Sequence, residues 1–212
     1  ACFVMGTNDL VKDLRARHTP LRLPMLVALG TTMLVARAYG LAILDGVYNH
    51  PTHHVGSTAL LATFFFAFQI YCDFSAYSDI AIGTARVMGI DLLRNFRRPY
   101  FASGFSDFWG RWHISLSTWF RDYVYIPLGG NRGGFWLTNR NVFLVFLVSG
   151  IWHGANWTFV LWGIAHGCLI LGENLWARSV SPRVSPRLAP PLWLRQAGTF
   201  VAVMLTWVLF RA

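Results

Sequence analysis

The most constraining feature of the sequence is an uncharged segment, residues 141–171, which contains no Asp, Glu, Lys or Arg. A helix crosses a hydrocarbon layer about 30 Å thick with about 20 residues, so this segment is longer than a single crossing requires. Gly154 and Asn156 lie near its middle and weaken a helix there. These residues favour a hairpin or a broken, re-entrant pair of helices. One long tilted helix is the competing interpretation, and in either case His153 lies at membrane depth.

Composition extends this interpretation to the whole chain. Hydrophobic residues make up 55% of the 212 residues and charged residues only 13%, whereas soluble domains carry about 25% charged residues. Further apolar segments occupy residues 23–44, 57–71 and 197–210. The sequence therefore predicts an all-α, polytopic helical membrane protein with the lipid bilayer as its surroundings.

Basic residues lie in short runs between the apolar segments. The chain has 18 Lys and Arg against 9 Asp and Glu, which gives a formal net charge of +9. Such a balance is compatible with nucleic-acid binding, but its placement between apolar segments is typical of cytoplasmic loops in membrane proteins. We therefore predict no nucleic-acid partner and a cytoplasmic loop at the Pro- and Arg-rich residues 178–195.

Residues 106–134 combine aromatic and polar side chains in a helical pattern. One side carries apolar residues: Trp109, Trp112, Leu116, Trp119 and Phe120. The opposite side carries polar residues: Arg111, Ser115, Thr118 and Asp122. This pattern predicts an amphipathic helix that is too charged to face lipid all round. Pro127 and the glycines after it end that helix.

His153 and His113 are the histidines with the strongest candidate roles. The plain structural interpretation of His153 is a buried histidine that hydrogen-bonds a neighbouring carbonyl. The functional interpretation is a proton acceptor, because an ionisable residue in a membrane span is costly and a pKa of about 6.5 suits acid–base chemistry at cellular pH. For His113 the alternatives are an interfacial histidine among aromatic anchors and a second active-site residue beside His153.

Metal and cofactor sites find little support in the sequence. The loop histidines His50, His53 and His54 have no neighbouring Cys or acid cluster, so we expect no metal site. His153 and His166 are thirteen residues apart, which is about 20 Å along one helix, and they could not bind the same haem iron. We therefore expect no bound cofactor.

Two acids, Asp73 and Asp79, follow the second apolar segment. One interpretation is the cation path of a non-enzymatic transporter or channel. The other is a pair of side chains that stabilise the helix bundle by pairing with nearby arginines. We favour the second interpretation, because arginines outnumber acids in this region.

Three strings of residues together resemble the membrane-bound O-acyltransferase family. They are IYCDFSAYSDIAIG, then NFRRPYFASGFSDFWGRWHISLSTWFRDYVYIPLGGNRGG, and finally SGIWHGANWTFVLWGIAHG. Within the family, PLGGNR at residues 127–132 makes the chain most similar to the bacterial alginate O-acetyltransferase branch. Family members are considerably longer. The resemblance therefore implies that residues 1–212 are part of a single transmembrane domain, truncated at both ends.

The resemblance implies an O-acyltransferase of the bacterial inner membrane. The family's WHG histidine is taken to be catalytic and falls on His153, as general base, while its RWH histidine falls on His113. The acetyl group would come from a thioester co-substrate such as acetyl-CoA and pass to an extracytoplasmic polysaccharide or a periplasmic acetyltransferase partner. We expect Asn156, Arg111 and Trp152 to contact substrate. D-alanyl transfer from a carrier protein to a cell-wall polymer is the alternative within the family.

Overall fold

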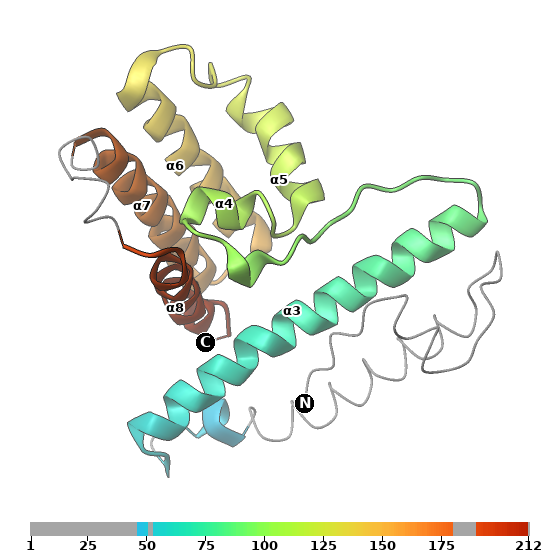
Figure 1. Cartoon of the computed structure of the whole chain (residues 1–212), viewed down its shortest axis with the longest axis vertical. Coiled ribbons are helices and arrows are strands. Elements are labelled where there is room, and N and C mark those ends of the chain that lie inside the picture. The colour runs from blue at the N-terminus through green and yellow to red at the C-terminus, as the bar shows by residue number, and fades with distance from the viewer. Residues whose placement is uncertain (1–45, 51–52, 180–189, 212) are drawn as a thin grey trace. The chain divides into compact units, whose positions relative to one another are not determined.

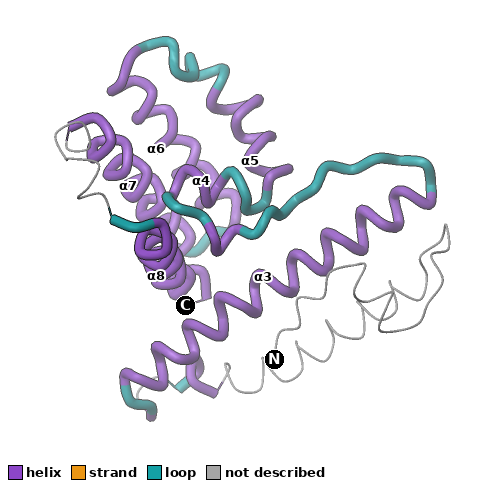
Figure 2. Tube along the Cα trace, viewed as in Figure 1, coloured by secondary structure: helices purple, strands orange, loops and turns teal. Residues whose placement is uncertain are grey.

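The computed structural model describes residues 46–50, 53–179 and 190–211, which belong to two units, residues 1–94 and 95–212, considered separately below. The predicted span at 23–44 lies outside the described residues. Within the described ranges every regular element is a helix, as the sequence predicts (Figure 2). Four of these helices, α3, α6, α7 and α8, are long and apolar enough to cross a membrane.

In the N-terminal unit, the long helix α3 (Gly56–Val87) contains the apolar segment predicted at 57–71 and continues beyond it. The same helix runs on without a break through Asp73 and Asp79. Its 32 residues extend about 48 Å, which exceeds the thickness of a bilayer core. Gly89, at φ +76°, follows its end, in a left-handed conformation that glycine adopts without strain.

The uncharged segment forms a helical hairpin in the second unit. Helix α6 (Gly134–His153) and helix α7 (Trp157–Ser179) are separated by residues 154–156 and lie side by side (Figure 1). The prediction of a broken pair is therefore confirmed, and one long tilted helix is wrong. The break falls at Gly154, as helix propensity indicates.

Small residues bring the two hairpin helices into backbone contact. A methyl group added to Gly163 would overlap the Phe146 carbonyl oxygen, and one added to Gly150 would overlap the Phe159 carbonyl oxygen. Farther from the break, the Asn174 side-chain amide donates to the Asn139 side-chain oxygen at 2.8 Å. Because the small residues let the helices approach and the amides fix their register, α6 and α7 pack antiparallel along most of their length.

Helix α8 (Leu192–Arg211) packs against α7. It begins five residues before the apolar segment predicted at 197–210. The predicted loop at 178–195 is shorter in the structure, because α7 continues to Ser179 and α8 starts at Leu192; residues 180–189 of that loop lie outside the described residues.

The prediction of one continuous amphipathic helix that starts near residue 106 and is ended by Pro127 is wrong, because the helix is interrupted before Ile114. The segment forms helix α4 (Phe105–Trp109), helix α5 (Ile114–Phe120) and the π-helix η3 (Arg121–Tyr125), preceded by the short 3-10 turn η2 (Pro99–Phe101). Trp112 is 3% exposed and Trp119 is 50% exposed, so the aromatic residues do not share one face.

Backbone hydrogen bonds from an earlier segment break this helix. The Ile114 amide donates to the Asn95 carbonyl and the Arg97 amide donates to the Arg111 carbonyl, each at 2.9 Å. Between these two bonds, His113 adopts a left-handed conformation with φ 46° and ψ 54°. This conformation costs a non-glycine residue about 1–2 kcal/mol. The two backbone hydrogen bonds to the 95–97 segment stabilise it.

Candidate active site

His153 is the last residue of α6 and is surrounded by aromatic rings from three helices. Its ring centroid lies 5.0 Å from that of Trp152, 5.2 Å from Trp162 and 5.0 Å from Phe210, while Phe159 is more distant at 6.4 Å. The imidazole is half-buried. Among the described residues, no group hydrogen-bonds either of its ring nitrogens. The plain structural interpretation of His153, a ring satisfied by a neighbouring carbonyl, therefore has no support in the described part of the chain.

His113, at the N-terminus of α5, is held by the side chain of Asn95. The Ser115 backbone amide donates to Asn95 Oδ1 at 3.2 Å, and an amide N–H can only donate, so the Asn95 atom on this side is its oxygen. His113 Nδ1 lies 3.2 Å from the same oxygen. Nδ1 must therefore carry the proton, which leaves Nε2 with its lone pair and makes it the basic nitrogen of His113.

His113 lies within electrostatic range of His153. Burial, and after it the electrostatic influence of His153, lower the pKa of His113 to about 4. Two imidazoles that interact in this way disfavour a positive charge on each other, so His113 is neutral at cellular pH. The expectation that His113 is a second active-site residue beside His153 stays a prediction.

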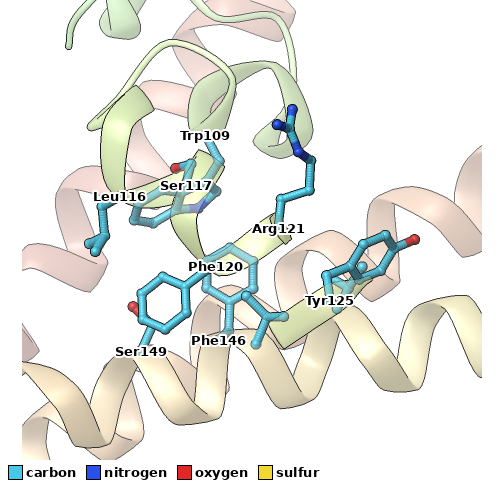
Figure 3. Close-up of a pocket in the computed structure, with 10 residues that line it drawn as sticks. Trp109, Leu116, Ser117, Phe120, Arg121, Tyr125, Phe146 and Ser149 are labelled. Carbon is cyan, nitrogen blue, oxygen red and sulfur yellow. The ribbon is translucent and has the colours of Figure 1, made fainter. Parts of the chain in front are cut away.

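A cavity of about 210 Å³ lies between α6 and the segment formed by α5 and η3 (Figure 3). Its walls are mostly apolar and aromatic, with Trp109, Phe120 and Phe146 among them. The Arg121 guanidinium points away from these rings in Figure 3 and donates to Asp122 at 2.7 Å. The cavity is thus a largely apolar pocket between two helical segments.

Helical register connects this cavity to His153. On α6 the lining residues Val145 and Ser149 are followed, at the next i+4 position, by His153. His113 directly precedes α5, which lines the opposite wall with Leu116, Ser117 and Phe120, but its left-handed backbone takes it out of the helical register. Residues four apart lie on one face of a helix, so His153 is one turn from the cavity on the face that lines it.

The three residues expected to contact substrate have other contacts in the structure. The Arg111 Nε donates to Asp107 Oδ1 at 2.6 Å. Asn156 is exposed, and its side-chain oxygen accepts from the Thr158 amide at 3.4 Å, so it caps the start of α7. Trp152 is 60% exposed and contacts the His153 ring. Of the three, Trp152 alone contacts a candidate catalytic side chain, and the substrate role of each stays a prediction.

His166 is a structural histidine. It is 0% exposed; the Trp109 indole N–H donates to its Nδ1 at 3.3 Å, and its Nε2 lies 2.9 Å from the Thr206 hydroxyl. The Thr206 hydroxyl itself donates a hydrogen bond to the Val203 carbonyl at 2.7 Å. His166 Nε2–H is therefore the donor to Thr206, and both ring nitrogens are satisfied in the neutral form.

The remaining polar candidates lie in the N-terminal unit. His50 and His53 stack with ring centroids 5.5 Å apart, and the described residues contain no group of three or more His, Cys, Asp or Glu side chains placed to hold a metal ion. Asp79 lies within electrostatic range of Arg94, which agrees with the interpretation that this acid pairs with an arginine.

Sequence reasoning missed Asn95 and Trp109 as parts of the site. Asn95 sits in an irregular stretch without periodicity, and its contact with His113 spans 18 residues. Trp109 was assigned to an apolar helix face, whereas it lines the cavity and holds His166 from a different helix. The contacts of Asn95 with His113 and Ser115 reveal its role, and these contacts are visible only in the folded structure.

Comparison with known proteins identifies relatives of this chain. The model of the membrane-bound O-acyltransferase family matches residues 39–210. The probable alginate O-acetylase of Pseudomonas aeruginosa is 47% identical over 154 residues, and the peptidoglycan O-acetyltransferase of Helicobacter pylori is 42% identical over 154 residues. The teichoic acid D-alanyltransferase of Bacillus subtilis is 33% identical over 139 residues.

These alignments cover most of this chain but a minor part of each relative. The first two cover 73% of this chain and 28% and 29% of the relatives, and the third covers 60% of this chain and 34% of the relative. The chain therefore spans about a third or less of the length of these proteins.

Proposed function

Because the chain belongs to the membrane-bound O-acyltransferase family, we propose that it carries the catalytic centre of an enzyme that moves an acetyl group from a thioester to a hydroxyl. The observation that carries this proposal is a largely apolar cavity with His153 one helical turn away on one wall and His113, whose pKa His153 influences, at the start of the helix that forms the other wall. Acyl transfer to a hydroxyl needs a proton acceptor at the attacking oxygen and a water-poor site for the reactive thioester.

His153 is the general base in this mechanism. Its imidazole removes the proton of the acceptor hydroxyl while that oxygen forms a bond to the thioester carbonyl carbon. The tetrahedral intermediate then collapses, the carbon–sulfur bond breaks, and His153 returns the proton to the leaving thiolate. The products are an ester and a free thiol. Such a proton transfer contributes about 10²–10⁴-fold in rate.

His113 acts beside this base. Its Nδ1–H is engaged by Asn95, so its Nε2 accepts a hydrogen bond from a second donor group of the acceptor molecule and orients that molecule, while the attacking hydroxyl gives its one proton to His153. This role requires a neutral ring, which the pKa of about 4 ensures at cellular pH. Asn156 and Trp152 are the side chains near His153 that we expect to contact the substrate during the reaction.

The names of the relatives support a polysaccharide as the acceptor. The more similar proteins are named for alginate and for peptidoglycan acetylation, and the less similar one for D-alanyl transfer to teichoic acid. We therefore propose an extracytoplasmic polysaccharide, or an acetyltransferase that passes the group to one, as acceptor, and acetyl-CoA as donor. In this proposal the protein lies in the bacterial inner membrane, and D-alanyl transfer is the second candidate.

The test is a His153→Ala substitution in the full-length protein, with polymer acetylation measured after confirming normal expression and membrane insertion. We expect a loss of at least about 100-fold, whereas His54→Ala, in an exposed loop outside the site, retains activity. Acetylation at the wild-type level in the His153 variant would overturn the mechanism. An Asp79→Asn variant tests the transporter interpretation, which predicts that the carboxylate, and not His153, is essential.

A further inference from the structure

Glu173 of α7 contacts the start of a distant helix. Its Oε1 accepts a hydrogen bond from the Phe105 amide at 3.2 Å, and its Oε2 accepts from the Ser106 amide at 2.8 Å and the Ser106 hydroxyl at 2.9 Å. These partners are 67 and 68 residues away in the sequence. Glu173 is the only acid in α7, a helix apolar enough to span a membrane. Placing a carboxylate in such a helix costs free energy unless hydrogen-bond partners stabilise it.

The contact supplies what α4 lacks locally. The first amides of a helix have no partner within it and are usually capped by a preceding side chain. The residue at that position is Gly104, which has no side chain to offer. Glu173 therefore serves as the cap from another helix, and its negative charge also suits the positive end of the helix dipole.

Gly104 leaves room for this carboxylate. Its backbone is extended, with φ −178°, a conformation that any residue adopts. A Cβ at this position would, however, overlap Glu173 Oε1. Gly104 is therefore required by the close approach of the carboxylate and not by its own dihedral angles.

Helix α4 carries the residues that shape the site. Phe108 is 1% exposed and stacks on Trp112 with centroids 5.6 Å apart, and Trp112 directly precedes His113. Trp109 lines the cavity and donates to His166. Displacement of α4 would therefore move both a cavity wall and the backbone that holds His113.

A second acid secures the same helix from within. Asp107 accepts from the Ser103 amide at 3.0 Å and from Arg111 Nε at 2.6 Å. Burial alone would raise the pKa of Asp107, but these hydrogen bonds and the Arg111 charge lower it overall. This local pair fixes the shape of the turn, but it does not attach α4 to α7. That attachment is made by Glu173, by the Trp109–His166 hydrogen bond and by the edge-to-face contact of Trp109 with Trp162 of α7.

We propose that Glu173 is a positioning residue for acyl transfer: by capping α4 from α7 it sets the position of Trp109 in the cavity wall and of His113 beside His153. The proposal rests on the acyl-transfer function proposed above. It predicts that loss of the cap slows the chemical step more than it weakens donor binding, because a small displacement of reacting groups affects rate steeply.

The experiment compares Glu173→Gln and Gly104→Ala, singly and together, in the full-length protein. The glutamine keeps the size of the side chain but places an N–H₂ group against amide donors. The alanine displaces the carboxylate from the opposite side. We expect each single variant to lower kcat by roughly 10–100-fold with the KM for acetyl-CoA near the wild-type value. The double variant should be no slower than the worse single variant, because both remove one contact.

Two controls separate the possible failures. Gly172→Ala, next to Glu173 with open space around the added methyl group, should keep wild-type kcat, and His153→Ala reports on the proposed function in the same assay. If His153→Ala is inactive while Glu173→Gln keeps wild-type kcat, the positioning role is wrong and the proposed function stands. If the kcat losses of the two single variants multiply in the double variant, the positioning role of Glu173 is also wrong. If His153→Ala stays active, the proposed function itself fails.

Discussion

Thr206→Val removes a single hydroxyl from the hydrogen-bonded core around His166 and should destabilise the protein. Valine has nearly the volume of threonine, so the substitution leaves no cavity. It does remove the acceptor of His166 Nε2–H. Since His166 is 0% exposed, water cannot replace that acceptor.

A change of tautomer cannot relieve the loss. If the proton moved to Nδ1, it would face the Trp109 indole N–H, which can only donate. One buried donor therefore stays unpaired in the first tautomer, and two face each other in the second. An unpaired buried donor costs about 1–3 kcal/mol in proteins, and measured hydrogen bonds between membrane helices average about 0.6 and reach about 1.7 kcal/mol. We expect a loss of about 1–2 kcal/mol, at the upper part of the membrane range.

The assay is equilibrium unfolding of the full-length protein in detergent micelles, followed by tryptophan fluorescence. Thr199→Val, on the same helix, is the matched control: Thr199 is also buried, but its hydroxyl donates to the Arg195 carbonyl of its own helix, and its removal orphans no donor. A Thr206→Val variant no less stable than Thr199→Val would refute the hydrogen-bond assignment at His166.

Three further predictions follow from the site and the hairpin. The pKa of His113 is about 4 in the folded protein and about 6.5 in the unfolded chain, so the unfolded state binds the proton first as the pH falls. The free energy of unfolding should therefore decrease as the pH drops from about 6.5 toward 4. His113→Gln should reduce this decrease in unfolding experiments across that range. Asn95→Leu removes the acceptor of His113 Nδ1–H, and we expect kcat for acetyl transfer to fall by roughly tenfold or more; an unchanged kcat would show that the orientation of His113 does not matter. Gly163→Ala forces a methyl group against the Phe146 carbonyl and should destabilise the hairpin by about 1–3 kcal/mol, whereas Gly198→Ala, with open space on α8, should not lower the unfolding midpoint.

The hairpin was predictable because its cause is local. Gly154 and Asn156 interrupt an apolar run that is too long for one crossing, and the structure breaks the helix between residues 153 and 157. The apolar length of the segment and the weak helix propensity at its centre are both properties of the residues themselves. No distant contact was needed to anticipate α6 and α7.

The breaks within 106–134 were not predictable, because their causes are distant. The turn at His113 depends on hydrogen bonds from Asn95 and Arg97, and the start of α4 depends on Glu173. The helical pattern of aromatic residues in this segment does not indicate these distant hydrogen-bond partners. For the same reason the sequence named His113 and His153 but could not place them together, and Asn95 carried no signal at all.

The uninterrupted α6 also sets the distance between the Asn139–Asn174 contact and His153. From Asn139, whose side chain binds Asn174, to His153 at the far end there are fourteen residues, which is about 21 Å of helix. The cavity lies along the turns between them, at Val142, Val145, Phe146 and Ser149. In the proposed acyl transfer, a donor entering at the Asn139 end would have to reach about 20 Å along α6 with its thioester, so the length of this helix would set a minimum length for the donor.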